Sequence, residues 1–73
     1  MPGPELGRLI REIRGSRSLR EFAADLGVSY NSPYHWEHGL HKPNPEAFYA
    51  LCRQATPSQR KRLEKLIVGN GRN

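Results

Sequence analysis

The stretch from residue 30 to residue 42 gathers side chains that could do chemistry. Its three histidines, His35, His38 and His41, could ligate a metal together with Cys52. Structural zinc sites usually carry more cysteines in tight pairs, however, so we expect no metal and no cofactor. The sequence has no recognisable motif of serine, histidine and acid and no Gly-rich phosphate loop, so we expect no enzyme. Polar surface and contact with a nucleic acid explain these side chains better.

The elements that must position this stretch follow from the spacing of apolar residues. Apolar side chains recur at helical intervals, and no segment alternates with period two for long enough to indicate a strand. The sequence therefore predicts an all-α fold with five short helices in one domain, residues 1–68, followed by a flexible tail, 69–73. The helices are expected at 4–14, 18–26, 29–38, 45–54 and 57–68.

Local signals mark the ends of these helices. Ser18 and Glu21 have the spacing of a capping box, and Gly27 is suited to end the helix that Ser18 begins. Ser29 is a candidate N-cap for the next helix, which places two capped helices around a sharp reversal at Gly27. Such a pair is a helix-turn-helix, and its second helix would project a polar face that suits the major groove of DNA.

Two runs of residues in this region resemble a known family. The run Ser18-Leu19-Arg20-Glu21-Phe22-Ala23-Ala24-Asp25-Leu26-Gly27-Val28-Ser29, followed by Trp36-Glu37-His38-Gly39 and Lys42-Pro43, is similar to the lambda-repressor-like (Cro and Xre type) helix-turn-helix. The resemblance covers about residues 6 to 55. It implies a lambda-repressor-like DNA-binding domain whose recognition helix begins near Ser29.

The resemblance also implies roles for individual side chains. The residues expected to contact base edges are Tyr30, Asn31, Ser32, Tyr34 and His35. Asn31 could pair with adenine, and His35 could donate to guanine. The residues expected to contact DNA phosphates are Arg17, Ser18, His38, His41 and Lys42. Arg14 and Glu37 are expected to form a structural ion pair, and Trp36 is expected in the core.

The sequence departs from the family pattern in three places. Leu19 replaces a polar residue that usually touches phosphate, and the preceding loop is about two residues shorter than is common. Pro33 replaces a branched apolar residue inside the recognition helix, where it removes a backbone donor and disfavours helical angles at Ser32. The recognition helix could therefore begin at Pro33, with Tyr30 and Asn31 in the turn, or near Ser29; we favour the longer helix.

Composition narrows the class of protein without choosing a partner. Twelve Lys and Arg residues against seven Asp and Glu give a net charge of +5, which suits nucleic acid, an anionic membrane or an acidic protein. The single cysteine excludes a small secreted fold held by internal disulfides. No stretch approaches the roughly 20 apolar residues of a membrane span, and the N-terminus has no signal-peptide hydrophobic region. We expect a cytoplasmic protein with no membrane partner, associated with the nucleoid when bound.

The last predicted helix, 57–68, leaves the choice of partner open. Its apolar stripe, Leu63, Leu66 and Ile67, is expected to make a homodimer contact, as C-terminal helices of the family often do. The leading hypothesis is a sequence-specific regulator that binds a palindromic operator, a repressor of its own or a neighbouring operon in a phage or mobile element. One alternative is an antitoxin or adaptor whose main partner is a protein bound through this helix. Another is an RNA or nonspecific nucleic-acid binder.

Overall fold

The computed structural model describes residues 4–67, which form five short helices and no strand. These are α1 (Pro4–Arg14), α2 (Leu19–Leu26), α3 (Asn31–Glu37), α4 (Pro45–Gln54) and α5 (Pro57–Ile67). The predicted all-helical fold is confirmed. None of these helices is long and apolar enough to cross a membrane. The predicted tail, 69–73, lies outside the described residues.

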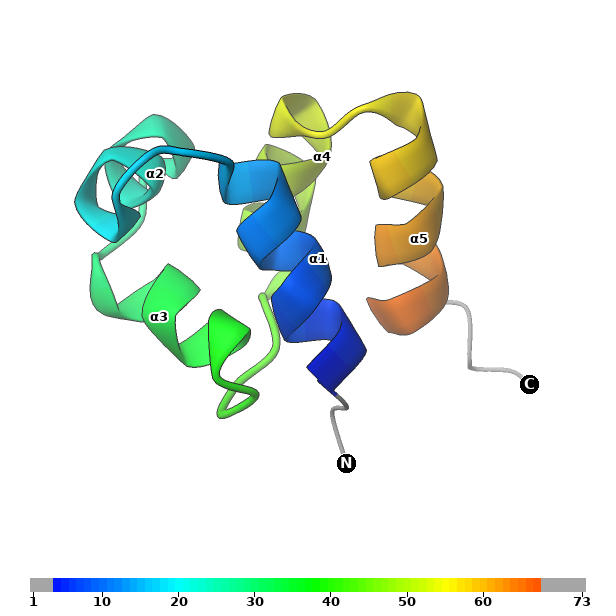
Figure 1. The fold of residues 1–73 in the computed structure, drawn as a ribbon, viewed down its shortest axis with the longest axis horizontal. Helices are drawn as coiled ribbons and strands as arrows, with labels where there is room; N and C mark the ends of the chain where they lie inside the picture. The colour runs from blue at the N-terminus through cyan, green and yellow to red at the C-terminus, as the bar shows by residue number, and fades with distance from the viewer. Residues whose placement is uncertain (1–3, 68–73) are drawn as a thin grey trace.

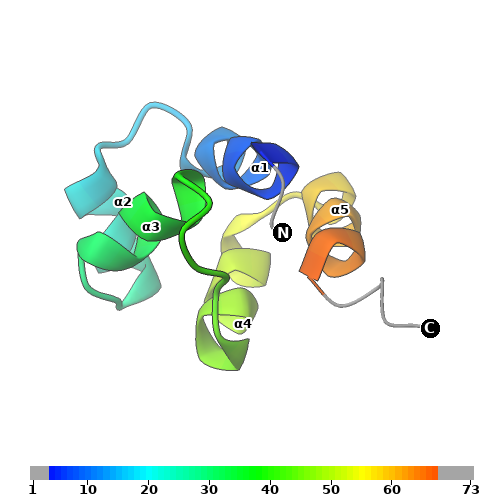
Figure 2. The same ribbon diagram turned by 90° about the horizontal axis from the view of Figure 1, so that it is seen from below.

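Helix α1 lies between the helices at the two ends of the molecule. It packs against α3 on one side and against α5 on the other, as Figures 1 and 2 show. Its apolar stripe, Leu6, Leu9, Ile10 and Ile13, is buried along its whole length. The core that these residues share with the other helices is built from Phe22, Leu26, Trp36, Ala47, Leu51 and Leu63.

The helix ends follow the local signals in the sequence. The Glu21 amide donates to Ser18 Oγ at 3.1 Å, and the Ser18 amide donates to the Glu21 carboxylate at 2.9 Å, which completes the predicted capping box. Asn44 Oδ1 accepts from the Ala47 amide at 2.8 Å and so caps α4. Each cap satisfies an amide that the first turn of a helix leaves without an intrahelical acceptor.

Helix α3 begins at Asn31, two residues after the predicted start and before Pro33. The Asn31 amide donates to Ser29 Oγ at 3.3 Å, and Tyr30 precedes the helix with helical φ and ψ angles. Pro33 is the third residue of α3 and is fully buried. Its missing N–H costs little there, because amides of the first turn have no intrahelical acceptor. The observed start lies midway between the two predicted ones: Asn31 belongs to the helix, as in the longer alternative, and Tyr30 precedes it, as in the shorter alternative.

Helix α5 closes the core from the end of the molecule opposite α2 and α3 (Figure 1). Leu63 is completely buried among residues of the same chain, so it is a core residue and offers no surface to a second subunit. Leu66 and Ile67 are partly exposed.

Hydrogen bonds also join α5 to α1. Gln59 and Arg62 both donate to the Glu12 carboxylate, at 3.1 and 3.2 Å. These bonds lower the pKa of Glu12, and the bond from Gln59 has the larger effect.

Candidate nucleic-acid interface

The turn between α2 and α3 sets the direction of α3. Gly27 has a φ of 75°, a left-handed conformation that glycine adopts without steric cost, and its amide donates to the carbonyls of Ala23 and Ala24. The Val28 amide donates to the Ala23 carbonyl at 3.0 Å. Ala23 is buried, and Val28 packs partly against the core. The chain therefore reverses tightly, and α3 packs against α2.

The inner face of α3 is fixed to the core by packing. Trp36, predicted as a core residue, is 4% exposed, and Pro33 is fully buried beside it on the same face. A buried aromatic side chain contributes on the order of 2–3 kcal/mol by leaving water. These two side chains hold a helix of only seven residues, which would be marginal in isolation.

An ion pair ties the end of α3 to α1. Arg14 Nε donates to one carboxylate oxygen of Glu37 at 2.8 Å, and Arg14 Nη2 donates to the other at 3.2 Å. The Glu37 side chain is 2% exposed, and Arg11 Nε lies 3.7 Å from the same carboxylate. Two parallel bonds of this kind fix orientation as well as distance. The ion pair expected between Arg14 and Glu37 is present.

Gly7 allows α1 and α3 to approach closely. It is buried in α1, and a Cβ atom added there would collide with the Glu37 carbonyl oxygen and lie 3.0 Å from the carbonyl carbon. Gly7 was not among the residues predicted to have a role. The sequence did offer one indication of its role: Gly7 lies inside an amphipathic helical pattern, where a glycine often allows another element to pack closely.

The outer face of α3 is polar and open to solvent. Asn31 and His38 are exposed, and Ser32 and His35 are partly exposed. The two tyrosines of this surface, Tyr30 and Tyr34, are 47% and 38% exposed. All five predicted base-contacting residues therefore keep solvent-exposed surface, four of them within α3 and Tyr30 directly before it, whereas Pro33 and Trp36 of the same helix are buried.

The rings on this face contact one another. The Tyr34 and His38 rings lie 4.2 Å apart between centroids, and His35 and His41 meet edge to face at 5.1 Å. His38 Nδ1 donates to the Tyr34 carbonyl at 2.9 Å. This bond leaves Nε2 of His38 as the ring nitrogen open to an outside partner. The contacts reduce the number of rotamers available to the rings before any ligand binds.

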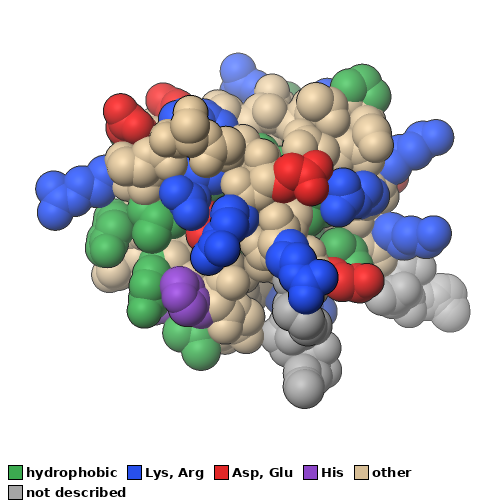
Figure 3. Space-filling view, viewed as in Figure 1, with side chains coloured by type: hydrophobic (Ala, Val, Ile, Leu, Met, Phe, Trp, Pro, Cys, Tyr) green, Lys and Arg blue, Asp and Glu red, His purple; other side chains and the backbone are tan. Residues whose placement is uncertain are grey.

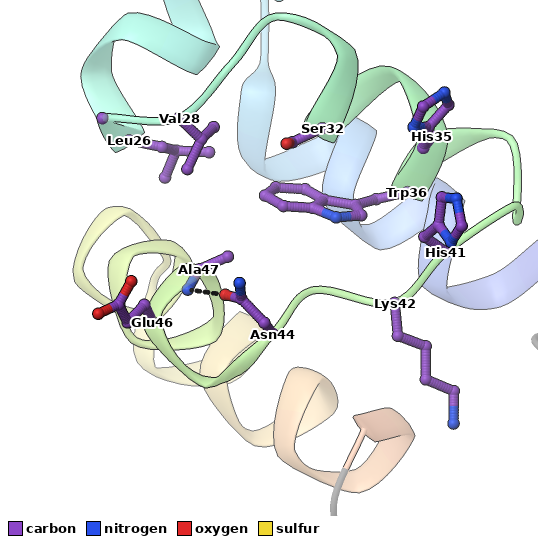
Figure 4. A pocket seen from close by; sticks show the side chains of 11 residues that line it. Leu26, Val28, Ser32, His35, Trp36, His41, Lys42, Asn44, Glu46 and Ala47 are labelled. Carbon is purple, nitrogen blue, oxygen red and sulfur yellow. Dashed lines mark hydrogen bonds between the residues drawn. The ribbon is translucent and has the colours of Figure 1, made fainter.

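A groove of about 390 Å³ runs between α3 and the start of α4 (Figure 4). Trp36 and Ala47 form its floor, and Ser32, His35 and His41 lie on the side of α3. The Lys42 side chain extends away from the other lining residues (Figure 4). The predicted phosphate contacts His41 and Lys42 are both exposed, and the groove joins them to the outer face of α3.

Arg17 was predicted to contact DNA phosphates, but its guanidinium is hydrogen-bonded within the chain. Its guanidinium donates to the carbonyls of Ile13 and Arg14, to the Asp25 carboxylate at 2.7 Å and to the Gln54 side chain at 2.8 Å. Four of the five N–H groups of an arginine are then occupied. Arg17 thus ties the end of α1 to α2 and α4. Ser18 is exposed, but its hydroxyl already accepts the capping bond.

Arg20 lies beside the outer face and was not among the predicted contacts. Its guanidinium carbon is 5.8 Å from the centre of the Tyr30 ring. It follows Leu19, the position where a polar residue was expected and is missing. The sequence indicated a DNA contact for Arg20 only through its place in the basic N-terminal half, and Arg17, whose donors are occupied within the chain, shares that place.

Basic side chains do not gather in one patch on the face of the molecule that Figure 3 shows. In Figure 3 the Lys and Arg side chains spread over the visible face, and histidine lies among hydrophobic side chains over α3. Within residues 4–67, no group of three or more His, Cys, Asp or Glu residues could hold a metal ion.

Comparison of the chain with protein-family models, with curated proteins and with solved structures gave no match.

Proposed function

We propose that this chain binds double-stranded DNA through a lambda-repressor-like helix-turn-helix formed by α2 and α3. The observation that carries the proposal is the division of α3 into two faces. Pro33 and Trp36 fix its inner face, while hydrogen-bonding side chains occupy its outer face. A helix presented in this way fits the major groove, where base edges offer a distinct pattern of donors and acceptors.

The side chains of α3 have the chemistry to read bases. Asn31 stands at the exposed start of α3 and can both donate to and accept from adenine. His35 sits beside the groove between α3 and α4 and can donate to guanine. Ser32, Tyr30 and Tyr34 surround them and complete the proposed base-reading face.

Backbone phosphates are the proposed partners of the flanking residues. Lys42 and His41 follow α3, and His38 ends it, so all three would lie along one strand when α3 is in the groove. Arg20 joins them on the side of Tyr30, and Arg17 leaves the set because its donors are occupied. Phosphate contacts of this kind set the position of α3 and carry no sequence information.

The biological role that we propose is repression by a homodimer that covers promoter DNA. With Leu63 buried in the core, the proposed contact between subunits depends on Leu66 and Ile67, which are partly exposed at the end of α5. Two copies of α3 would then enter successive major grooves about 34–36 Å apart.

The decisive experiment selects sequences from a pool of random duplex DNA with the purified protein at near-physiological salt. We expect enrichment of a pseudo-palindrome whose half-sites lie about 10–11 bp apart. Enrichment of a single half-site would support sequence-specific DNA binding and argue against a dimer. Retention of all sequences alike, with a steep salt dependence, would reject sequence-specific binding.

A matched pair of variants locates the interface in the same experiment. Tyr34→Ala and Tyr49→Ala each remove an exposed tyrosine, but only Tyr34 belongs to α3. We expect Tyr34→Ala to weaken enrichment and Tyr49→Ala, on α4, to leave it unchanged. Equal effects of the two changes would place the DNA elsewhere.

A further inference from the structure

Helix α3 carries no arginine and no lysine. Its seven residues, Asn31–Glu37, offer an amide, a hydroxyl, a phenol ring and an imidazole to solvent. The full cations of the proposed interface, Arg20 and Lys42, lie outside the helix. Arginine or lysine paired with guanine is the commonest specific contact in the major groove. The outer face of α3 is therefore poorly suited to guanine-rich DNA and must draw its specificity from another feature of the base edges.

Tyr34 lies in the middle of the outer face of α3. It comes three residues after Asn31 and four residues before His38, and this spacing puts the three side chains in a row along one side of the helix. The side chains on either side of it in this row are polar. Tyr34, at 38% exposure, is the large apolar side chain that α3 itself leaves in contact with solvent.

Two histidine rings hold the Tyr34 ring in place. Its centroid lies 4.2 Å from that of His38, with the planes inclined by 32°, and 5.8 Å from that of His35, with the rings edge to face. The His38 ring is fixed in turn by the bond between its Nδ1 and the Tyr34 carbonyl. A ring that is already restricted loses little rotamer freedom when a ligand covers its remaining surface. Such a surface favours contact with an apolar group of the ligand.

The major groove offers one apolar group on its base edges, the C5-methyl group of thymine, among hydrogen-bond donors and acceptors. On the basis of the proposed DNA binding, we propose that the ring of Tyr34 reads the C5-methyl group of a thymine in each half-site. This thymine lies within about three base pairs of the adenine bound by Asn31. Three residues of helix span about 4.5 Å, stacked base pairs are about 3.4 Å apart, and the tyrosine side chain extends the reach further.

Deoxyuridine in place of thymine removes the methyl group alone and leaves the hydrogen-bonding edge of the base intact. The operator enriched by the selection on random duplex DNA is the starting point, and each of its thymines is replaced in turn. Fluorescence anisotropy then measures the affinity of the full chain for each duplex. We expect one position per half-site at which the replacement weakens binding by about threefold to fivefold, the effect of one lost methyl contact. Replacement of the other thymines should leave the affinity unchanged.

A double-mutant cycle between protein and DNA assigns the methyl group to a side chain. In Tyr34→Ala the preference for thymine over uracil at the sensitive position should disappear, because the ring is gone. Tyr34→Phe retains the ring and should retain the preference. Tyr30→Ala is the matched control, since Tyr30 is also exposed, at 47%, but precedes α3 and has the Arg20 guanidinium over its ring. The preference should persist in this control. The substitutions in the DNA need no change to the protein, so they test the proposal even if a variant fails to fold.

Methylated cytosine tests whether the methyl group itself is read. Cytosine at the sensitive position should bind more weakly than thymine. Methylation of this cytosine at C5 should recover affinity by a factor similar to that lost with uracil, because the methyl group occupies the same place on both pyrimidines.

Four results would overturn the proposal. They are an operator in which no thymine is sensitive to loss of its methyl group, a preference for thymine that survives Tyr34→Ala, a loss of the preference in Tyr34→Phe, which would assign the contact to the hydroxyl, and 5-methylcytosine that binds no better than cytosine. Each of them leaves the enriched operator, and with it sequence-specific DNA binding, in place. Failure to enrich any sequence would instead reject the proposed function, and this proposal with it.

Discussion

Replacing Gly7 with alanine tests the close approach of α1 and α3. The new Cβ would meet the Glu37 carbonyl oxygen, and it would lie 3.0 Å from the carbonyl carbon and 3.3 Å from Cα of Glu37. All three atoms belong to the backbone, so no side chain can rotate to make room. One helix must shift relative to the other.

Whether Gly7→Ala raises or lowers the stability of the protein shows which of two opposing contributions is larger, the helix propensity of alanine or the collision between α1 and α3. Alanine is favoured over glycine inside a helix by about 1 kcal/mol, so propensity alone predicts a more stable protein. Overpacking of a well-packed core costs roughly 1–3 kcal/mol. Because the collision involves backbone on both sides, we take the upper part of that range. The net result is a loss of about 1–2 kcal/mol, or a fall in Tm of roughly 4–16 °C for a domain of this size.

Thermal and urea unfolding of Gly7→Ala measure this loss, with Arg8→Ala as the matched control. Arg8 is the next residue of α1 and is exposed, so its change should stay within about 0.5 kcal/mol of zero. Gly7→Ala should also weaken DNA binding at temperatures where it is folded, because Glu37 ends α3. A rise in Tm would refute the close approach and with it the role given to Gly7.

Three further changes test the ion pair, the placement of the arginines and base reading. Glu37→Gln should lower the free energy of unfolding in urea by about 2–4 kcal/mol, because it leaves the charge of Arg14 without its carboxylate partner near a buried site. Adding Arg14→Met to the same chain should restore part of that loss, and no recovery would mean that the two residues do not stabilise the fold as a pair. Arg17→Ala should lower stability and leave the salt dependence of DNA binding unchanged, while Lys42→Ala should reduce the salt slope by about 1 with stability preserved. Asn31→Ala should cost about 1–3 kcal/mol on the selected operator and relax specificity at one position, and an equal loss on every duplex would argue against base reading.

The helix boundaries could be predicted because local chemistry sets them. Ser18 and Glu21 are three residues apart, and their two hydrogen bonds depend on the first turn of α2 alone. The start of α3 was less certain, because Pro33 permits two local solutions. Packing in the core sets the start of the helix: Pro33 is buried as the third residue of α3, which begins at Asn31.

Contacts between helices were predicted less well. Arg14 and Glu37 could be paired from the sequence through the resemblance, whereas Arg17 could not be separated from other arginines. Its partners, Asp25 and Gln54, lie 8 and 37 residues away and meet it only after α2 and α4 have packed. The position of Gly7 opposite the Glu37 carbonyl likewise depends on how α1 crosses α3.

The placement of the basic residues limits how much of the net charge DNA can use. Arg14 and Arg17 pair with carboxylates of the same chain. The basic side chains of α5 lie at the end of the molecule away from α3. Arg20 and Lys42 are the full cations placed beside α3 in the proposed complex. At about 0.9 per phosphate neutralised, two cations per subunit give a slope of log K against log salt near −2, or near −4 for a dimer. A much steeper slope would mean that the cations of α5 also contact DNA, and it would contradict the placement of the DNA on the α3 side of the molecule alone.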